Sequence, residues 1–426
     1  DKRSAQTGGR YSLFDVRAGA MRAIAASGVV AERAQLEETI EDVVARAVQM
    51  SVDMLDGESR VPAHIKQFMS TSTAAMKLDL AARFDRLNEP GRMLTADSVA
   101  EISARVLEDG KSLDAGQADA AAAIAGTARL VTVTGPAGTG KTTLLKVAKA
   151  ALEAQGRQLI AVAPTKKAAS VVGREIGTTA SSLHALLLDH GWRWGVDSSG
   201  AQVWTLLQPG DYDPGRVDEH GRPVVYEGPR RFPLRAGDRI VVDEAGMVDL
   251  HTANALAQLA EATGAGIAMV GDHLQAMPVG HSGAMATMKN RSGAVVELTA
   301  VHRFTDPEYG ALSLRLREPA NLQDAAAVAW ALTGRGLVKT VRSQDEAREH
   351  MVTAYLQADA AGRRVSLVTS TNEEAQQIND TIQAALVDAG RLSDRVVAIG
   401  QNEQRLLLRD VVQTRRNDSG TGVENR

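Results

Sequence analysis

Apolar side chains in the first quarter of the chain recur at helical spacing. The segment AQLEETIEDVVARAVQM places apolar residues three or four positions apart, which lines one face of an α-helix. The residues on that face are Leu36, Ile40, Val43, Ala47 and Met50. A second helix is predicted for LDLAARFDRL, with Leu80, Phe84 and Leu87 on one side. Residues 1–112 are therefore predicted to form a helical N-terminal region.

From about residue 128 the pattern changes to short, uninterrupted apolar runs separated by helical segments. The runs are RLVTVT (129–134), LIAVA (159–163), RIVVD (239–243), GIAMV (266–270) and RVSLVTS (364–370). Apolar strands that alternate with helices indicate a parallel sheet covered on both faces, so the predicted fold class is α/β. Residues 188–236 break this alternation, are rich in Gly, Pro, Trp and Asp, and are predicted to form a β-rich insertion.

Composition adds limits but no function. The chain has 426 residues, 44% of them hydrophobic, and lacks a run of about 18 apolar residues that could span a bilayer, so we expect a soluble protein without membrane insertion. It contains no cysteine, which fits the reducing cytoplasm, the expected location. The net charge of −4 means that any binding to nucleic acid depends on a local basic cleft.

The sharpest chemical signal is GPAGTGKTT, which follows the strand RLVTVT directly and precedes a helix. This order is that of a P-loop, in which Lys141 neutralises the β- and γ-phosphates of ATP and the Thr142 hydroxyl ligates Mg²⁺. The remaining predicted nucleotide contacts are Gly135, Pro136, Ala137, Gly138, Thr139, Gly140 and Thr143.

Two further strands end in polar residues that suit ATP hydrolysis. Asp243 can hold Mg²⁺ through water, and Glu244 is placed to act as the general base for the attacking water. An acidic helix N-cap is the structural alternative for this pair. The strand GIAMV is followed by Asp272 and by Gln275, whose amide can contact the γ-phosphate and the water. No Asn-Lys-X-Asp guanine motif occurs, which disfavours a GTPase.

In this order the motifs resemble the RecD-like branch of superfamily-one DNA helicases, whose motor domains are RecA-like. LDAGQADA resembles the adenine-recognising Q motif, which implies that Gln117 contacts ATP. LTAVHRF resembles the motif whose arginine, here Arg303, reaches the γ-phosphate from the second motor domain. The resemblance implies a first RecA-like domain over 113–298 and an incomplete second one, with the start of an inserted β domain, over 299–426.

The same resemblance implies contacts with single-stranded DNA. APTKKAA, TASSLHALL and VTSTNEEAQQIN resemble DNA-contact motifs, and the residues that match are Thr165, Lys166, Ser182, His184, Thr371 and Asn372. Lys166 and His184 have simpler alternatives, since lysines often only solvate a helix start and a lone histidine beside a ligand cleft is often a supporting hydrogen-bonding group.

The insertion carries three tryptophans, Trp192, Trp194 and Trp204, with two alternative roles. The resemblance places a β-hairpin pin that splits the duplex in this interval, where the rings could stack on bases. We favour the alternative, in which they form the small core of the hairpin.

Within the helicase branch, the chain is most similar to the helicase portion of conjugative relaxases of the TraA/TrwC, or MobF, type. The supporting segments are YSLFDVRAGAMRAIAASG, DEAGMVDL and DVVQTRRND. This implies 5′-to-3′ unwinding in plasmid transfer, with relaxosome and secretion-channel proteins as further partners. No histidine cluster or tyrosine pair for DNA nicking is found among the residues given. A stand-alone repair helicase and a scaffold that binds nucleotide without hydrolysis remain as alternatives.

The resemblance also bears on the ends of the chain. The final stretch RDVVQTRRNDSGTGVENR reads as a strand, Val411 to Thr414, that runs into a polar turn. Relatives continue beyond this point, so we expect a piece cut at both ends of a longer protein. Such a piece is expected to bind ATP weakly, to hydrolyse it poorly and not to unwind DNA.

Overall fold

The computed structural model describes residues 8–55, 61–108, 110–178, 180–198, 202–272, 274, 283–400 and 403–412. Its contacts divide the chain into two compact units, Asp1–Arg317 and Glu318–Arg426. Each unit is described by itself. The domain boundaries predicted at residues 112 and 298 stay predictions.

A six-stranded parallel sheet in the order β13-β4-β12-β11-β5-β6 forms the centre of the first unit. The strands are β4 Leu130–Thr134, β5 Leu159–Ala163, β6 Ala180–Ser182, β11 Arg239–Val242, β12 Gly266–Gly271 and β13 Ala294–Glu297. Four of them coincide with predicted apolar runs, and the predicted α/β class with a RecA-like P-loop sheet is confirmed.

Hydrophobic cores cover both faces of this sheet, because successive side chains of a strand point to opposite sides. Ile160 and Val162 of β5 belong to one core, while Leu159 and Ala161 belong to the other. Burial on both faces explains why the strands read as continuous apolar runs rather than as alternating patterns.

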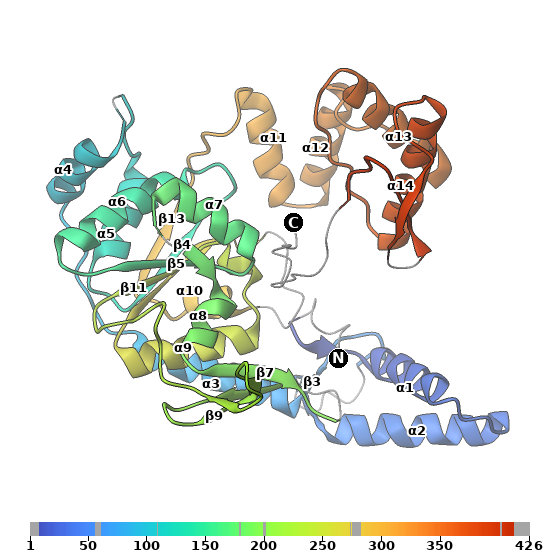
Figure 1. The fold of residues 1–426 in the computed structure, drawn as a ribbon, viewed down its shortest axis with the longest axis horizontal. Helices are drawn as coiled ribbons and strands as arrows, with labels where there is room; N and C mark the ends of the chain where they lie inside the picture. Colours follow the sequence, from blue (N-terminus) through green and yellow to red (C-terminus); the bar gives the residue numbers. More distant parts are fainter. Residues whose placement is uncertain are drawn as a thin grey trace. The chain divides into compact units, whose positions relative to one another are not determined.

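Helices form the outer layers, and Figure 1 shows them on the two sides of the sheet. One face is covered by α4 Ala96–Val106, α5 Ala115–Ala125, α6 Lys141–Ala154 and α7 Lys166–Ile176. The other is covered by α3 Thr71–Leu87, α8 Leu183–Asp189, α9 Leu250–Thr263 and α10 Ala284–Lys289. The first unit ends with α11 Pro307–Arg317.

The N-terminal region contains the predicted helices and also a small sheet. The predicted helices appear as α2 Arg33–Gln49 and α3, and α1 Leu13–Ser27 precedes them. Three short antiparallel strands lie in the order β1-β3-β2 and were not predicted: β1 Arg10–Tyr11, β2 Ser51–Asp53 and β3 Phe68–Ser70. Strands of two or three residues are too short to show a period-two pattern, which explains why the sequence did not reveal them.

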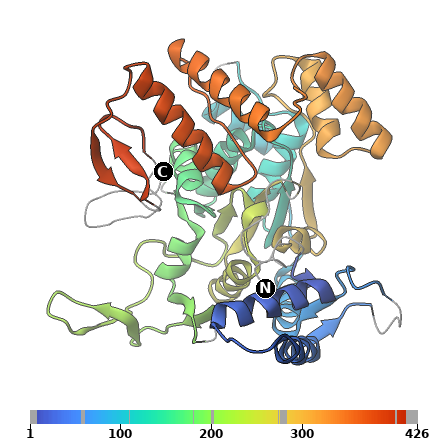
Figure 2. The same ribbon diagram turned by 90° about the vertical axis from the view of Figure 1, so that its right-hand side faces the viewer.

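The insertion predicted at 188–236 is β-rich, as expected. It holds two antiparallel pairs, formed by β7 Trp192–Val196 with β8 Gln202–Leu206, and by β9 Tyr212–Val217 with β10 Pro223–Val225. Figure 2 shows these strands, in light green, extending away from the central sheet. Arg193 of β7 forms an ion pair with the buried Asp213 of β9 at 2.6 Å, which joins the two pairs.

The second unit holds α12 Leu322–Gly334, α13 Gln344–Ala360, α14 Asn372–Asp388 and a hairpin of β14 Val396–Ile399 with β15 Arg405–Leu407. Its small core contains Val352, Ile378 and Ile382. The predicted strand at 364–370 is wrong, because these residues form no strand. A parallel strand needs a neighbour for its backbone groups, and the two strands described in this unit pair with each other.

The strand predicted at Val411–Thr414 is also not confirmed. Val411 and Val412 lie in no strand, and residues 413–414 are outside the described part of the chain. Among the helices that the structure describes, none combines the length and apolar character needed to cross a bilayer.

Candidate nucleotide-binding site

The predicted site residues of the first unit follow the carboxyl ends of its parallel strands. In a parallel sheet these ends lie along one edge, where open α/β folds bind their ligands. The loop 135–140 leaves β4 and enters α6, and the Gly135 N–H donates to the Gly271 carbonyl at the end of β12 (3.1 Å). Gly138 and Gly140 adopt φ angles of +88° and +71°, which favour glycine. The loop therefore has the backbone of a phosphate cradle.

Lys141, the first residue of α6, is turned back onto this loop. Its Nζ donates hydrogen bonds to the Gly135 carbonyl at 2.9 Å and to the Pro136 carbonyl at 3.0 Å. Burial lowers the pKa of Lys141, and the nearby carboxylates of Glu244 and Asp243 act in the opposite direction. The ammonium group is thus held beside the cradle, surrounded by carbonyl oxygens that a phosphate oxygen can replace.

Gln117 braces the same loop from α5. Its Nε2 donates to the Thr139 carbonyl at 3.0 Å, and its Oε1 accepts from the Asp114 N–H at 3.1 Å in a helix capping box. A Cβ at Gly140 would collide with the Gln117 Nε2, so a side chain there would displace this amide, and the φ of +71° independently favours glycine. The structure gives Gln117 a role in holding the loop, while its predicted adenine contact stays a prediction.

Asp243 and Glu244 stand at the end of β11, two strands away from β4. The Asp243 N–H donates to the Val162 carbonyl of β5 at 2.8 Å, which extends the sheet pairing to this carboxylate. Burial, followed by repulsion from Glu244, raises the pKa of Asp243 to about 6. A half-buried carboxylate beside a second carboxylate favours binding of a cation, which would offset both the burial and the repulsion.

Glu244 adopts a left-handed backbone with φ +53°, which is rare for a residue with a side chain. Such a conformation costs about 1–3 kcal/mol and persists when its surroundings enforce it. Here the end of β12 packs closely against the turn, because a Cβ at Gly271 would lie 2.8 Å from the Ala245 nitrogen. The next residues form a short 3-10 helix, η2 Ala245–Met247, so Glu244 is not the N-cap of a long helix.

Asp272 follows β12 and is held by an arginine that the sequence did not single out. Its side chain is about 1% exposed and forms a two-pronged ion pair with Arg317, at 3.0 Å to Nε and 2.5 Å to Nη2. Arg317 ends α11, 45 residues away, and no motif marked it in advance. Gln275, predicted to contact the γ-phosphate, lies outside the described residues.

Arg303 lies against the P-loop. The His302 N–H donates to the Gly138 carbonyl at 2.8 Å, and a Cβ at Gly138 would collide with the Cβ of Arg303. The His302 ring also pairs with Asp114 at 2.8 Å. The resemblance placed Arg303 in the second motor domain, whereas the structure groups it with the first unit. Its side chain is exposed, and its predicted contact with the γ-phosphate stays a prediction.

The donors at this edge fit a nucleotide-bound Mg²⁺. Thr142 offers a hydroxyl in the first turn of α6, and Asp243 offers a half-buried carboxylate whose pKa is raised by partial burial and by the neighbouring Glu244 carboxylate. Among the described residues no group of three or more His, Cys, Asp and Glu could hold a metal ion by itself. Mg²⁺ bound with ATP needs only one or two protein ligands, because phosphates and waters supply the rest.

Four predicted DNA contacts lie at the neighbouring ends of β5 and β6. Ala163 of β5 is the register partner of Ser182 of β6, and Thr165 follows two residues after Ala163. The hydroxyls of Thr165 and Ser182 cap α7 and α8, each accepting an N–H at 3.2 Å. A capping hydroxyl keeps its own proton to donate. Lys166 begins α7 with its side chain exposed, and His184 is in the first turn of α8.

The remaining predicted DNA contacts belong to the second unit. The Thr371 hydroxyl caps α14 by accepting the Glu374 N–H at 3.1 Å, and Asn372 is the first residue of that helix. The predicted set is therefore divided between the two units, and the contacts with DNA stay predictions.

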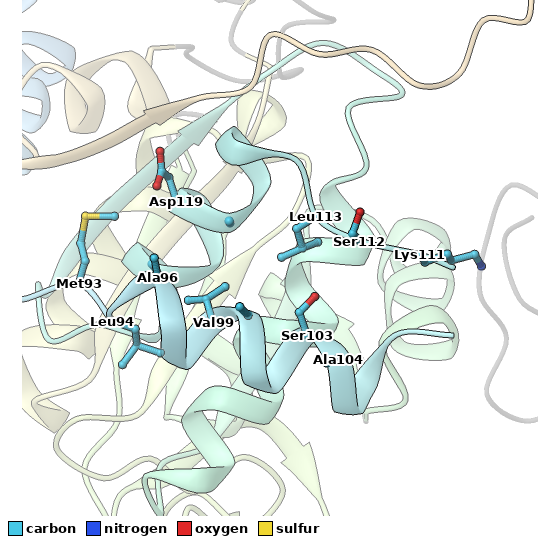
Figure 3. A pocket seen from close by; sticks show the side chains of 13 residues that line it. Met93, Leu94, Ala96, Val99, Ser103, Ala104, Lys111, Ser112, Leu113 and Asp119 are labelled. Carbon is cyan, nitrogen blue, oxygen red and sulfur yellow. The ribbon is translucent and has the colours of Figure 1, made fainter. Parts of the chain in front are cut away.

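A pocket of about 530 Å³ lies between α4 and α5, as Figure 3 shows. Leu94, Val99 and Leu113 give it an apolar lining, and Asp119 stands at its side. None of the predicted nucleotide contacts lines it. This pocket is therefore separate from the phosphate cradle.

The fold and the cradle define the chain as a P-loop nucleotide-binding protein with an α/β motor fold. A family model described as an AAA domain matches residues 112–343, more than half of the chain. The chain belongs to this AAA domain family.

The chain is also similar in sequence to curated conjugal transfer proteins. The conjugal transfer protein TraA of Agrobacterium fabrum (strain C58) is 24% identical over 417 residues, which cover 97% of this chain and 34% of that protein. TraA of Rhizobium radiobacter is 24% identical over 306 residues, covering 71% of this chain and 24% of its own length. The chain spans about a quarter to a third of these relatives. The predicted resemblance to RecD-like helicases and TraA-like proteins is confirmed.

Two solved structures are also similar to parts of the chain. The arterivirus nonstructural protein 10, a helicase solved with DNA, is 18% identical with a TM-score of 0.25, covering 47% of this chain and 42% of its own. The replication initiator DnaA bound to AMPPCP and single-stranded DNA is 13% identical with a TM-score of 0.23. The similarity covers 67% of this chain and 81% of the DnaA chain.

Proposed function

We propose that this chain is the ATP-driven motor part of a DNA helicase that acts in conjugal DNA transfer. The observation that carries the proposal is the meeting of Lys141, Asp243 and Arg303 around one glycine loop at the carboxyl edge of a parallel sheet. Similarity to TraA proteins supports conjugation over repair as the process. The 5′-to-3′ polarity and the relaxosome and secretion-channel partners rest on the family resemblance.

ATP binding begins with an exchange of hydrogen bonds at Lys141. Without ATP, the ammonium group donates to the carbonyls of Gly135 and Pro136. Phosphate oxygens carry more negative charge than carbonyl oxygens and make stronger, charge-assisted hydrogen bonds. Lys141 therefore turns to the β- and γ-phosphates, while the N–H groups of the loop surround them.

Thr142 and Asp243 would hold Mg²⁺, which neutralises phosphate charge when it is bound with ATP. Glu244 is proposed to act as the general base for the attacking water, from a left-handed backbone position beside the end of β12. Arg303 stabilises the charge that develops on the γ-phosphate. Gln275 is proposed to orient the water, although it lies outside the described residues.

Single-stranded DNA is proposed to bind across the ends of β5 and β6. Thr165 and Ser182 present hydroxyls there and Lys166 presents a positive charge, and all three groups suit contacts with the phosphate backbone. Thr371 and Asn372 are proposed to supply a second grip. ATP binding and hydrolysis would alternate the two grips and move the strand.

Two variants separate a motor from a nucleotide-binding scaffold. We expect Lys141→Ala to weaken binding of a fluorescent ATP analogue by at least 10-fold, because the phosphates lose their main cationic partner. Glu244→Gln is expected to keep that binding and to lower phosphate release by roughly 100-fold or more, since only the general base is lost. If Glu244→Gln releases phosphate as fast as the unchanged chain, the proposed role of Glu244 as the general base is contradicted.

A further inference from the structure

Four aromatic rings, one from each of four elements, form a continuous cluster on the first unit. They are Trp194 of β7, Trp204 of β8, His184 of α8 and His251 of α9. The antiparallel register sets Trp194 directly opposite Trp204, so both rings lie on the same face of the hairpin. We name these four residues the aromatic surface.

The rings are arranged as a stack rather than as a random apolar contact. Trp194 and Trp204 are stacked with centroids 5.1 Å apart, and the His251 ring lies nearly parallel to Trp204 at 6.1 Å and 9°. His184 meets Trp194 edge-on at 4.9 Å. Each ring is thus fixed by a neighbour, which lowers the entropy lost when a further planar group is added.

Exposure distinguishes the three tryptophans of the insertion. Trp192 is buried in the core against α8 and α9, and Trp204 packs partly against that core. Trp194 remains 40% exposed, at the outer end of the stack. Trp192 and Trp204 therefore form the core of the hairpin. Trp194 is not part of this core.

The aromatic surface adjoins the strand ends that are proposed to contact DNA. His184 follows Ser182 by two residues in the first turn of α8, and Ser182 pairs with Ala163 of β5, just before Thr165 and Lys166. A strand whose backbone lies along these residues would bring its bases close to Trp194. Unpaired bases expose the flat faces that stack on aromatic rings, whereas bases inside a duplex do not.

We propose that the aromatic surface is a base-stacking site for single-stranded DNA, with Trp194 as its outermost ring. This inference rests on the proposed function and adds a specific contact to it. Stacking is tolerant of base identity, so the site would bind any unpaired sequence. The surface would hold bases while the strand ends hold the backbone.

The test measures binding of fluorescein-labelled dT20 to the full 426-residue chain by anisotropy, at one fixed salt concentration. Trp194→Leu keeps an apolar side chain but removes the aromatic face, and we expect the dissociation constant to rise by roughly 10-fold. Trp194→Tyr should recover most of the affinity. Trp330→Ala is the matched control, because Trp330 is 77% exposed on α12, and its affinity should not change.

A circular dichroism melt of each variant confirms that the hairpin remains folded. Equal dT20 affinity for the unchanged chain and Trp194→Leu would overturn the stacking site and leave the helicase proposal standing. Equal losses for Trp194→Leu and Trp194→Tyr would also overturn it, since the ring face would not matter. If the unchanged chain does not bind dT20 at all, this result contradicts both the stacking site and the proposed function as a DNA motor.

Discussion

At the scale of single residues, Arg239 is the largest of the fully buried side chains in the described part of the chain. Its guanidinium donates to four backbone carbonyls, those of Ile124, Gly126, Ala128 and Arg129, at 2.8–3.2 Å. Burial, with Arg157 nearby, lowers the pKa of Arg239 to about 9, which still leaves it charged at neutral pH. The hydrogen bonds offset the cost of burying this charge and tie the turn before β4 to the start of β11.

Replacement of this arginine should therefore be costly. We expect Arg239→Met to lower the free energy of unfolding by about 2–4 kcal/mol, because several buried carbonyls lose their donor. Chemical denaturation followed by circular dichroism measures the change. Arg235→Met is the control, since Arg235 is exposed four residues earlier, and its effect should stay within about 0.5 kcal/mol. Equal stability of the two variants would contradict this role for Arg239.

The raised pKa of Asp243 predicts that the stability of the fold and the affinity for Mg²⁺ both depend on pH. Because its pKa is raised to about 6 from 3.8, the folded chain binds this proton more tightly than the unfolded chain. Without metal, ionised Asp243 destabilises the fold in full above about pH 6, and this cost is relieved progressively as the pH falls from about 6 to 3.8. The affinity for Mg²⁺ is expected to fall as the pH falls, because a proton and the cation compete for the same carboxylate.

We therefore expect the affinity for Mg²⁺ in the presence of ATP to fall by nearly 10-fold for each pH unit below about 6. Titration calorimetry at several pH values measures this slope. Asp243→Asn should bind Mg²⁺ weakly at every pH and keep only the smaller slope that comes from protonation of the ATP phosphates. A slope in Asp243→Asn equal to that of the unchanged chain would assign the titration to another group.

At the scale of elements, the sequence predicted what depends on local pattern. The P-loop, the buried strands and helices α2 and α3 follow from spacing and from strong local motifs. It missed features that depend on distant partners, such as the Asp272–Arg317 ion pair and the contact of His251 with Trp204. The strand predicted at 364–370 failed for the same reason, since an apolar run becomes a strand only beside another strand.

Helix α3 shows how an element outside the AAA domain match contributes to the motor core. Leu80, Phe84 and Leu87 are fully buried against the sheet face that α9 covers, and Arg83 and Arg86 pair with Glu261 of α9. The helix is therefore part of the hydrophobic core of the first unit, and it lies within the region predicted as a helical N-terminal region.

We expect Phe84→Ala to lower the free energy of unfolding by about 3–5 kcal/mol, because it leaves a cavity in this core. Leu78→Ala, on the same helix, is the matched control, since Leu78 is 73% exposed and should change stability by less than about 1 kcal/mol. Thermal or urea unfolding compares the two. Similar losses for both variants would show that α3 does not pack on the sheet in solution.

At the scale of the whole molecule, the first unit contains the described parts of the phosphate site and of the aromatic surface. Thr371 and Asn372 of the second unit are proposed to supply the other DNA grip. The central claim is that DNA binding and ATP hydrolysis are coupled in this chain. Coupling requires that a ligand at one site change the free energy of events at the other.

The most direct test is the rate of phosphate release from ATP with and without dT20, for the unchanged chain and for Lys141→Ala. We expect a low basal rate that rises at least several-fold when dT20 is added, and no rise in Lys141→Ala, because the stimulation acts through the P-loop. A rate that dT20 does not alter, or one that Lys141→Ala leaves unchanged, would contradict the account of this chain as a DNA-dependent motor.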